Sequence, residues 1–225
     1  MQREHSRRSL AGTAAVVVAY AIAMGYLEAA VVVYLRQAVG IEHEALFPLH
    51  DGGGLQTLGP IELGRELATL VMLAGLGWLA GAERIERLAW TAVVFGTWDI
   101  TYYGWLWVFV GWPPSPATWD ILFLVPVPWV GPVWAPIVVS AALIGFGLLT
   151  ARRLRGGGAM AIGPWQVVGG LAGGVLVILS FTLDARHILA GGIPESWAWP
   201  VFVAGMALAT LAAGTALWPR GHRPA

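Results

Sequence analysis

Long apolar stretches alternate with short polar linkers along this chain. A helix that crosses a membrane needs about 20 largely apolar residues, because each helical residue adds about 1.5 Å of length. Six stretches satisfy this requirement, and they cover approximately residues 10–35, 60–79, 88–110, 133–150, 165–189 and 197–217. The pattern predicts an all-α, polytopic transmembrane helical bundle with six spans, in which residues 1–225 form a single integral membrane domain.

The composition agrees with a membrane protein. The chain is 57% hydrophobic and 12% charged, whereas about 25% of the residues in a soluble domain are charged. It has no cysteine, which excludes disulfides, zinc–thiolate sites and iron–sulfur clusters. The sequence identifies no cofactor. The expected partners are the lipid bilayer and either other membrane subunits or further copies of the chain, and no nucleic acid is expected.

The arginines are distributed unevenly between the two sides of the predicted bundle. Only Arg36, Arg65 and Arg186 lie on one side. The other ten lie on the opposite side: Arg3, Arg7, Arg8, Arg84, Arg87, Arg152, Arg153, Arg155, Arg220 and Arg223. Because basic linkers stay in the cytoplasm, the pattern predicts a bacterial inner-membrane protein with both termini cytoplasmic.

Two linkers on the outer side are long. Residues 37–59 contain His43, His50 and a glycine run, and we predict a flexible flap there. Residues 112–132, between spans three and four, are rich in proline and tryptophan, and proline at this density prevents a regular helix. Irregular backbone at membrane depth must be buried in protein or face water. We therefore expect 112–132 to be either a re-entrant or an interfacial segment.

Asp99 lies in the middle of the third predicted span. It follows Leu88 by eleven residues, which corresponds to about 16 Å of helix and reaches the centre of an apolar core about 30 Å thick. A charged Asp at that depth costs about 2.5–3.5 kcal/mol. Asp99 must therefore face the bundle interior, carry a proton or have a partner. Tyr102 and Tyr103 lie one turn outward on the same helix face.

Other ionisable residues are predicted at a similar depth or farther outward. Such residues inside a membrane are functional candidates by default. Span two places Glu62, Arg65 and Glu66 on one face, and span five places Ser180, Asp184 and His187 on one face. The candidate ligand-binding residues are Glu28, Glu66, Arg65, Asp99, Tyr102, Tyr103, Asp120, Asp184 and His187.

Structural explanations compete with a functional role. Glu62 follows Pro60, where an acid complements the dipole of a helix start. Asp120 can cap a helix formed by the apolar residues after it. Glu28 and Asp99 can serve only to hold helices together through hydrogen bonds.

Spans five and six each carry small residues that allow helices to approach closely. These residues are Gly169, Gly170, Gly173 and Gly174 in span five and Gly205, Ala209 and Ala213 in span six. The pattern predicts helix packing at these positions.

Four segments, YLEAAVVVYLR, ELGRELATLVML, FGTWDITYYGWL and TWDILFLVPVPWVGPVWAP, resemble a group of bacterial multi-pass inner-membrane proteins. The resemblance extends from span one to the start of span four, about half of the chain. It implies a multi-pass membrane fold, and it brings no activity, cofactor or site residue.

The combined pattern favours a polar site of carboxylate, Tyr and His side chains in the periplasm-facing half, which binds a small cationic, protonatable or lipid-like ligand. A di-metal site in a helical bundle usually has two Glu-x-x-His motifs, and here only Asp184 and His187 have a similar spacing. Neither G-x-S-x-G nor H-E-x-x-H occurs, and whether the chain is an enzyme stays open. The alternatives are a non-catalytic subunit or assembly factor of a larger membrane complex, and a proton-coupled transporter of small solutes.

Overall fold

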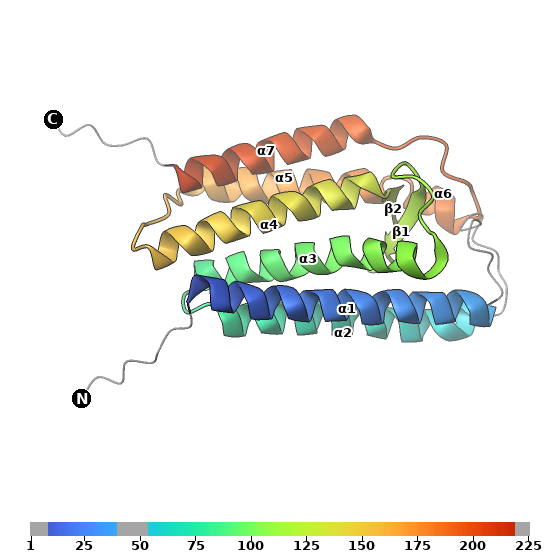
Figure 1. Ribbon diagram of the computed structural model, residues 1–225. Helices are drawn as coiled ribbons and strands as arrows, with labels where there is room; N and C mark the ends of the chain where they lie inside the picture. The colour runs from blue at the N-terminus through green and yellow to red at the C-terminus, as the bar shows by residue number, and fades with distance from the viewer. Residues whose placement is uncertain (1–8, 40–53, 219–225) are drawn as a thin grey trace.

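A computed structural model describes residues 9–39 and 54–218 of the protein. Its six long helices are α1 (Leu10–Val39), α2 (Gly54–Ala80), α3 (Arg84–Val110), α4 (Trp134–Arg155), α5 (Pro164–Thr182) and α7 (Trp199–Leu217). Successive long helices run in opposite directions, so α1 begins and α7 ends at the same end of the bundle (Figure 1). The predicted flap lies mostly outside the described residues, and both of its histidines do.

The structure is mostly helical, as predicted, and five segments are long and apolar enough to cross a membrane. They are α1, α2, α4, α7 and the segment from α5 to residue 189. Helix α3 is 27 residues long but less apolar. It packs against α1, α2 and α4, and its Trp90, Val93 and Val94 are fully buried. Because its neighbours shield α3 from lipid, it can carry more polar residues than a helix that faces the bilayer.

Apolar side chains cover much of the outer surface of the bundle. Leu79 is 84% exposed, Leu88 is 70% exposed and Leu171 is 67% exposed. Soluble monomers rarely expose large contiguous apolar patches, and the lipid tails of a bilayer are the natural surroundings for such a surface.

The segment between α3 and α4 is a β-hairpin, so the prediction of a purely α-helical chain was wrong here. Strands β1 (Trp119–Phe123) and β2 (Trp129–Pro132) pair antiparallel. The prolines exclude a helix, and the strand pair instead satisfies the backbone groups that burial would leave without partners. Asp120 lies within β1, so the helix-capping explanation for this residue was wrong as well.

The hairpin reaches deep into the bundle. The ring of Phe123 packs against Phe95 and Trp98 of α3, with ring centroids 6.4 Å and 6.3 Å apart. Both partners lie near the middle of α3. The hairpin therefore lies among the helices (Figure 1).

Two predicted helices have different boundaries in the structure. Helix α2 begins at Gly54, so Pro60 lies inside the helix and Glu62 is not at a helix start. The predicted fifth span is divided into α5 and the short helix α6 (Ala185–Leu189). Since α5 ends at Thr182, the helical periodicity that placed Ser180, Asp184 and His187 on one face does not continue through this segment.

Gly173 of α5 and Gly205 of α7 pack against the opposite helix, as predicted, whereas the packing predicted at Gly170 and Gly174 was wrong, because a Cβ there would meet no atom within 4 Å. A Cβ atom on Gly173 would lie 2.6 Å from the backbone nitrogen of Ala209, and one on Gly205 would lie 2.8 Å from the carbonyl oxygen of Gly173. A similar contact joins α3 to α4, where a Cβ on Gly96 would lie 2.5 Å from the carbonyl oxygen of Ser140. This second contact sets the geometry around Asp99.

Candidate functional site

Polar and ionisable side chains gather in the half of the bundle that contains the hairpin. They come from α1, α2, α3, α4 and β1, and we call them the outer polar cluster. The cluster consists of Glu28, Arg36, Glu62, Arg65, Glu66, Thr69, Asp99, Tyr102, Tyr103, Asp120 and Ser140. Its members form short polar contacts that link one helix to the next.

An ion pair joins α1 to α2. The Arg65 guanidinium donates to the Glu28 carboxylate through Nη1, and its Nε donates to Glu62 Oε2 at 2.7 Å. The Thr69 hydroxyl also donates to Glu28, at 3.1 Å. Arg65 therefore partly balances two carboxylates on neighbouring helices.

Glu66 connects α2 to the hairpin. Its two carboxylate oxygens lie 3.1 Å and 3.0 Å from the backbone nitrogen of Leu124, the residue that follows β1. Glu66 is buried, and this contact satisfies a backbone donor that would otherwise be costly inside the bundle. The hairpin turn is thus held in place by a carboxylate of α2.

Asp99 has a partner on α4. The Ser140 hydroxyl donates to Asp99 Oδ2 at 2.8 Å, and both side chains are buried. Gly96 lies one turn before Asp99, and its missing side chain lets α4 approach to this distance. Gly96 therefore allows the close helix contact on which the hydrogen bond between Ser140 and Asp99 depends.

Asp120 reaches the cluster from β1. Its Oδ2 accepts a hydrogen bond of 2.9 Å from the Tyr103 hydroxyl. Burial raises the pKa of Asp120 to about 6, although the nearby Arg36 guanidinium and the Tyr103 hydroxyl both act to lower it. Arg36 lies over the Trp112 ring at 4.6 Å, and within the described part of the chain its Nη1 has no hydrogen-bond partner.

Tyr102 lies between these contacts. Its ring lies against the rings of Tyr103 and Trp98, with centroids 5.0 Å and 6.4 Å apart, so it lies between the Tyr103–Asp120 contact and the part of α3 that carries Asp99. Across residues 9–39 and 54–218, no side chain or backbone group hydrogen-bonds to this hydroxyl. Tyr102 as a whole is half-buried.

Acidic groups outnumber basic groups in the outer polar cluster. It contains five carboxyl groups and two guanidinium groups, so three carboxyl groups lack a matching positive charge. An uncompensated carboxylate away from water is costly. The site must therefore hold protons or take up a cation to balance this excess.

Two predicted site residues lie elsewhere. Asp184 is half-buried and lines a separate cavity of 240 Å³ with Trp119 and Trp197. His187 is exposed, and its Nε2 lies 3.2 Å from the carbonyl oxygen of Ile193. The other candidates belong to the outer polar cluster: Glu28, Arg65, Glu66, Asp99, Tyr102, Tyr103 and Asp120.

Sequence reasoning did not include Arg36 or Ser140 among the candidates. Arg36 follows Glu28 by eight residues, and this spacing places both on the same face of α1. That signal could have identified Arg36. Ser140 is an uncharged residue in an apolar helix, and only the close approach of α3 and α4 shows its role.

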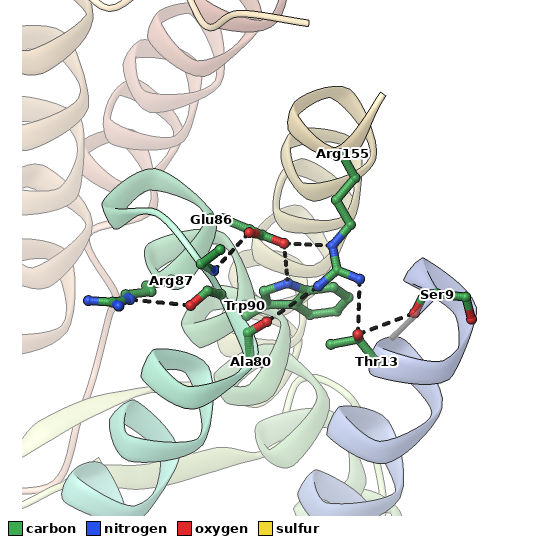
Figure 2. A network of polar contacts seen from close by, with 9 residues as sticks. Ser9, Thr13, Ala80, Glu86, Arg87, Trp90 and Arg155 are labelled. Atoms are coloured by element: carbon green, nitrogen blue, oxygen red, sulfur yellow. Dashed lines mark hydrogen bonds and ion pairs between the residues drawn. The ribbon is translucent and has the colours of Figure 1, made fainter. Parts of the chain in front are cut away.

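A second polar network lies at the opposite end of the bundle, and Figure 2 shows it. Arg155 Nε donates to Glu86 Oε1 at 2.6 Å, Nη1 donates to the Thr13 hydroxyl at 2.9 Å, and Nη2 donates to the Ala80 carbonyl at 3.3 Å. Trp90 Nε1 also donates to Glu86. We call this network the inner clamp, because Arg155 of α4 connects to α1, α2 and α3.

The inner clamp is a structural feature. Glu86 is 4% exposed, and each of its carboxylate oxygens accepts at least one hydrogen bond, including one of 2.9 Å from the backbone nitrogen of Ala82. Its charge is matched by Arg155. Unlike the outer polar cluster, the clamp has no excess of acidic groups to balance.

The described residues contain no group of three His, Asp or Glu side chains arranged to hold a metal ion. Comparisons with protein-family models, with characterised proteins and with solved structures give no match. A functional proposal therefore rests on the geometry and charge of the outer polar cluster.

Proposed function

We propose that this chain is a bacterial inner-membrane protein with six spans and cytoplasmic termini, and that its outer polar cluster binds a small cationic, protonatable or lipid-like ligand. The orientation is supported by Arg84, Arg87 and Arg152–Arg155, which lie at the end of the bundle where α1 begins. Basic residues of this kind stay on the cytoplasmic side. The outer polar cluster then lies in the half that faces the periplasm.

Helix α3 is the sixth span in this proposal. Its 27 residues extend over about 40 Å, which is enough to cross a bilayer. The helices on either side of it in sequence run opposite to it. The hairpin is a re-entrant segment whose turn is anchored by Glu66, and whose Phe123 packs on the middle of α3.

The buried excess of carboxyl groups is the observation that carries the proposed function. Protein structures seldom bury unpaired acids, because each one is costly, and acids inside membrane bundles mark sites for ions, protons or ligands. The unpaired Tyr102 hydroxyl and Arg36 Nη1 add hydrogen-bond donors at the same place. A cationic group on the ligand would balance the excess of acids, and a hydrogen-bond acceptor on the same ligand would satisfy the unpaired donors.

Native mass spectrometry of the protein, extracted from its own membranes in a mild detergent, tests the proposal. We expect a mass at a multiple of 23.9 kDa plus an adduct. The adduct should be absent from Glu28→Gln and Asp99→Asn and should be retained in Asp184→Asn, which changes an acid outside the cluster. Thermal unfolding of each variant confirms that the fold is intact.

Two results would contradict the proposal. One is the absence of any adduct on the wild-type protein. The other is an adduct that Asp99→Asn and Glu28→Gln retain at the wild-type level. Stoichiometric foreign subunits without an adduct would instead support the role of a subunit in a larger membrane complex.

A further inference from the structure

A cavity of 620 Å³ lies between α3, α4, α5 and α7, beside the outer polar cluster. Its walls are apolar apart from Asp99, Ser140 and two threonines, and they include Phe95, Leu143 and Phe146. The volume is within the range of about 300–1,000 Å³ that is usual for small-molecule sites. The cavity is therefore large enough for a ligand and suited to an apolar one.

Only one end of this cavity is strongly polar. Asp99 and Ser140, which hydrogen-bond to each other, contribute to its wall near the middle of the bundle. The hairpin adds Leu122, Phe123 and Trp129 beside them. From there the lining extends toward the cytoplasmic end of α3, where it includes Ile85. An occupant would meet a carboxyl group and a hydroxyl at one end and hydrocarbon along the rest.

The cavity reaches the surface that faces the bilayer. Among its lining residues, Leu88 is 70% exposed and Ile178 is 42% exposed, and these residues lie on α3 and α5. A molecule dissolved in the bilayer can therefore enter sideways between the helices. A water-soluble molecule would have to cross lipid to use the same opening.

The paired glycines of α5 serve two different purposes. Gly173 packs closely on α7, whereas Gly170 and Gly174 line the cavity, and a Cβ at either position would meet no atom within 4 Å. Larger side chains at these two positions would occupy the cavity without forcing the helices apart. Glycine at positions 170 and 174 therefore leaves this part of the cavity open.

The charges near the polar end limit the occupant's head group. The Asp99 carboxyl group lines this end of the cavity, and it belongs to a cluster in which acids outnumber bases. A phosphate or carboxylate placed there would be repelled. A hydroxyl or an amine can donate a hydrogen bond to Asp99 and adds no negative charge.

From these features we infer that the cavity holds the apolar tail of a lipid-like molecule. The head group of this molecule, an uncharged hydroxyl or a cationic amine, binds at Asp99 and Ser140. This inference rests on the proposed function and specifies its ligand class. The molecule enters from the bilayer. A hydroxyl head group donates a hydrogen bond to the Asp99 carboxyl group, and an amine head group also adds a positive charge that offsets one acid of the outer polar cluster.

Photolabelling of the full chain in lipid nanodiscs tests the inference. The probe is a 16-carbon alcohol with a diazirine in its chain, and the 16-carbon fatty acid with the same diazirine, used at pH 8, is the anionic comparison. We expect the alcohol to label peptides of α4 and α7 that line the cavity, and the acid to label them about tenfold less. Gly174→Leu should lower labelling by the alcohol about tenfold.

Gly145→Leu is the matched control, because Gly145 also has no atom within 4 Å of a Cβ but does not line the cavity. It should be labelled like the wild type. Gly170→Leu provides a second test if Gly174→Leu unfolds at a lower temperature.

The inference is overturned if both leucine variants of the cavity are labelled like the wild type, or if the label is spread evenly over the lipid-facing helices. Cross-links between two copies through the cavity would also overturn it, since a second chain would then be the occupant. If Gly174→Leu loses the label but retains the adduct seen by native mass spectrometry, the tail assignment fails and the proposed function stands. If the cavity is labelled equally in wild type and Asp99→Asn, the head-group assignment fails.

Discussion

The environment of Asp99 shows how a carboxyl group is held among apolar helices. Its hydrogen bond comes from Ser140, a residue of another helix. The two side chains can meet because Gly96 leaves room for the backbone of α4. The position of Asp99 therefore depends on Ser140 and Gly96, and each of these residues can be changed separately.

Ser140→Ala should destabilise the protein. It removes the hydroxyl that donates to Asp99 and leaves a buried carboxyl group without this partner, which costs about 1–3 kcal/mol. The expected result is a lower unfolding temperature in detergent. Ser180→Ala is the control, because among the described residues the Ser180 hydroxyl bonds only to the Val177 carbonyl of its own helix. Equal unfolding temperatures for the two variants would contradict the structural role given to Ser140.

At the scale of elements, close contacts between helices decide which polar side chains meet. The α3–α4 contact at Gly96 brings Ser140 to Asp99, and the α5–α7 contact at Gly173 leaves the next glycine facing the cavity. The hairpin is held by Glu66 of α2, whose carboxylate accepts a hydrogen bond from the backbone nitrogen of Leu124. Close contacts at glycines and polar contacts from charged side chains therefore assemble the site together.

Gly96→Ala should separate α3 from α4. The added Cβ would lie 2.5 Å from the carbonyl oxygen of Ser140, and backbone atoms cannot yield by a rotamer change. Overpacking of this kind typically costs about 1–3 kcal/mol. Gly104→Ala is the matched control in the same helix, because its Cβ would meet no atom within 4 Å, and it should be neutral or slightly stabilising. Thermal unfolding of the two variants compares them directly, and similar losses for both would show that the helix contact is not tight.

At the scale of the whole molecule, the two ends of the bundle differ in purpose. The inner clamp pairs its one buried acid with Arg155 and links four helices (Figure 2). In the described part of the chain, the outer polar cluster has more acids than bases, and the buried Arg36 Nη1 has no hydrogen-bond partner. One end is built for stability, and the other has the properties of a binding site.

Arg155→Gln should destabilise the bundle strongly. It leaves the Glu86 charge buried without its partner, and breaking a buried ion pair in this way costs about 3–5 kcal/mol. Arg153→Gln is the control, since within residues 9–39 and 54–218 the Arg153 side chain bonds only to the nearby Ala159 carbonyl. The measurement is the unfolding temperature of each variant, with ligand-adduct formation as a second readout. Loss of the adduct without loss of stability would show that the clamp belongs to the binding site.

The proposed orientation can be tested because the chain has no cysteine. Ala159→Cys and Ala190→Cys place single thiols at exposed positions at opposite ends of the bundle. In spheroplasts, a membrane-impermeant maleimide should label Ala190→Cys immediately and Ala159→Cys only after the membrane is permeabilised. The reverse pattern would mean that the outer polar cluster faces the cytoplasm.

The sequence indicated most of the cluster's residues but not their partners. Glu28, Asp99 and Glu66 stand out because an ionisable residue in an apolar helix is visible in a single stretch of sequence. Ser140 and the Leu124 backbone are ordinary in their own segments. Their importance depends on contacts across 41 and 58 residues of chain, and local periodicity carries no information about such contacts.

By itself, the sequence determined that this is a membrane protein of apolar helices, because hydropathy and helix length are properties of continuous segments. Tertiary structure alone decided that residues 119–132 form a hairpin, that α5 ends at Thr182 within the fifth predicted span, and which acids lie in one cluster. These features depend on packing between distant segments. Two polar groups on different helices can form a hydrogen bond only when the helices pack together. Burial of a polar group without such a partner costs free energy, so the packing and the polar contacts depend on each other.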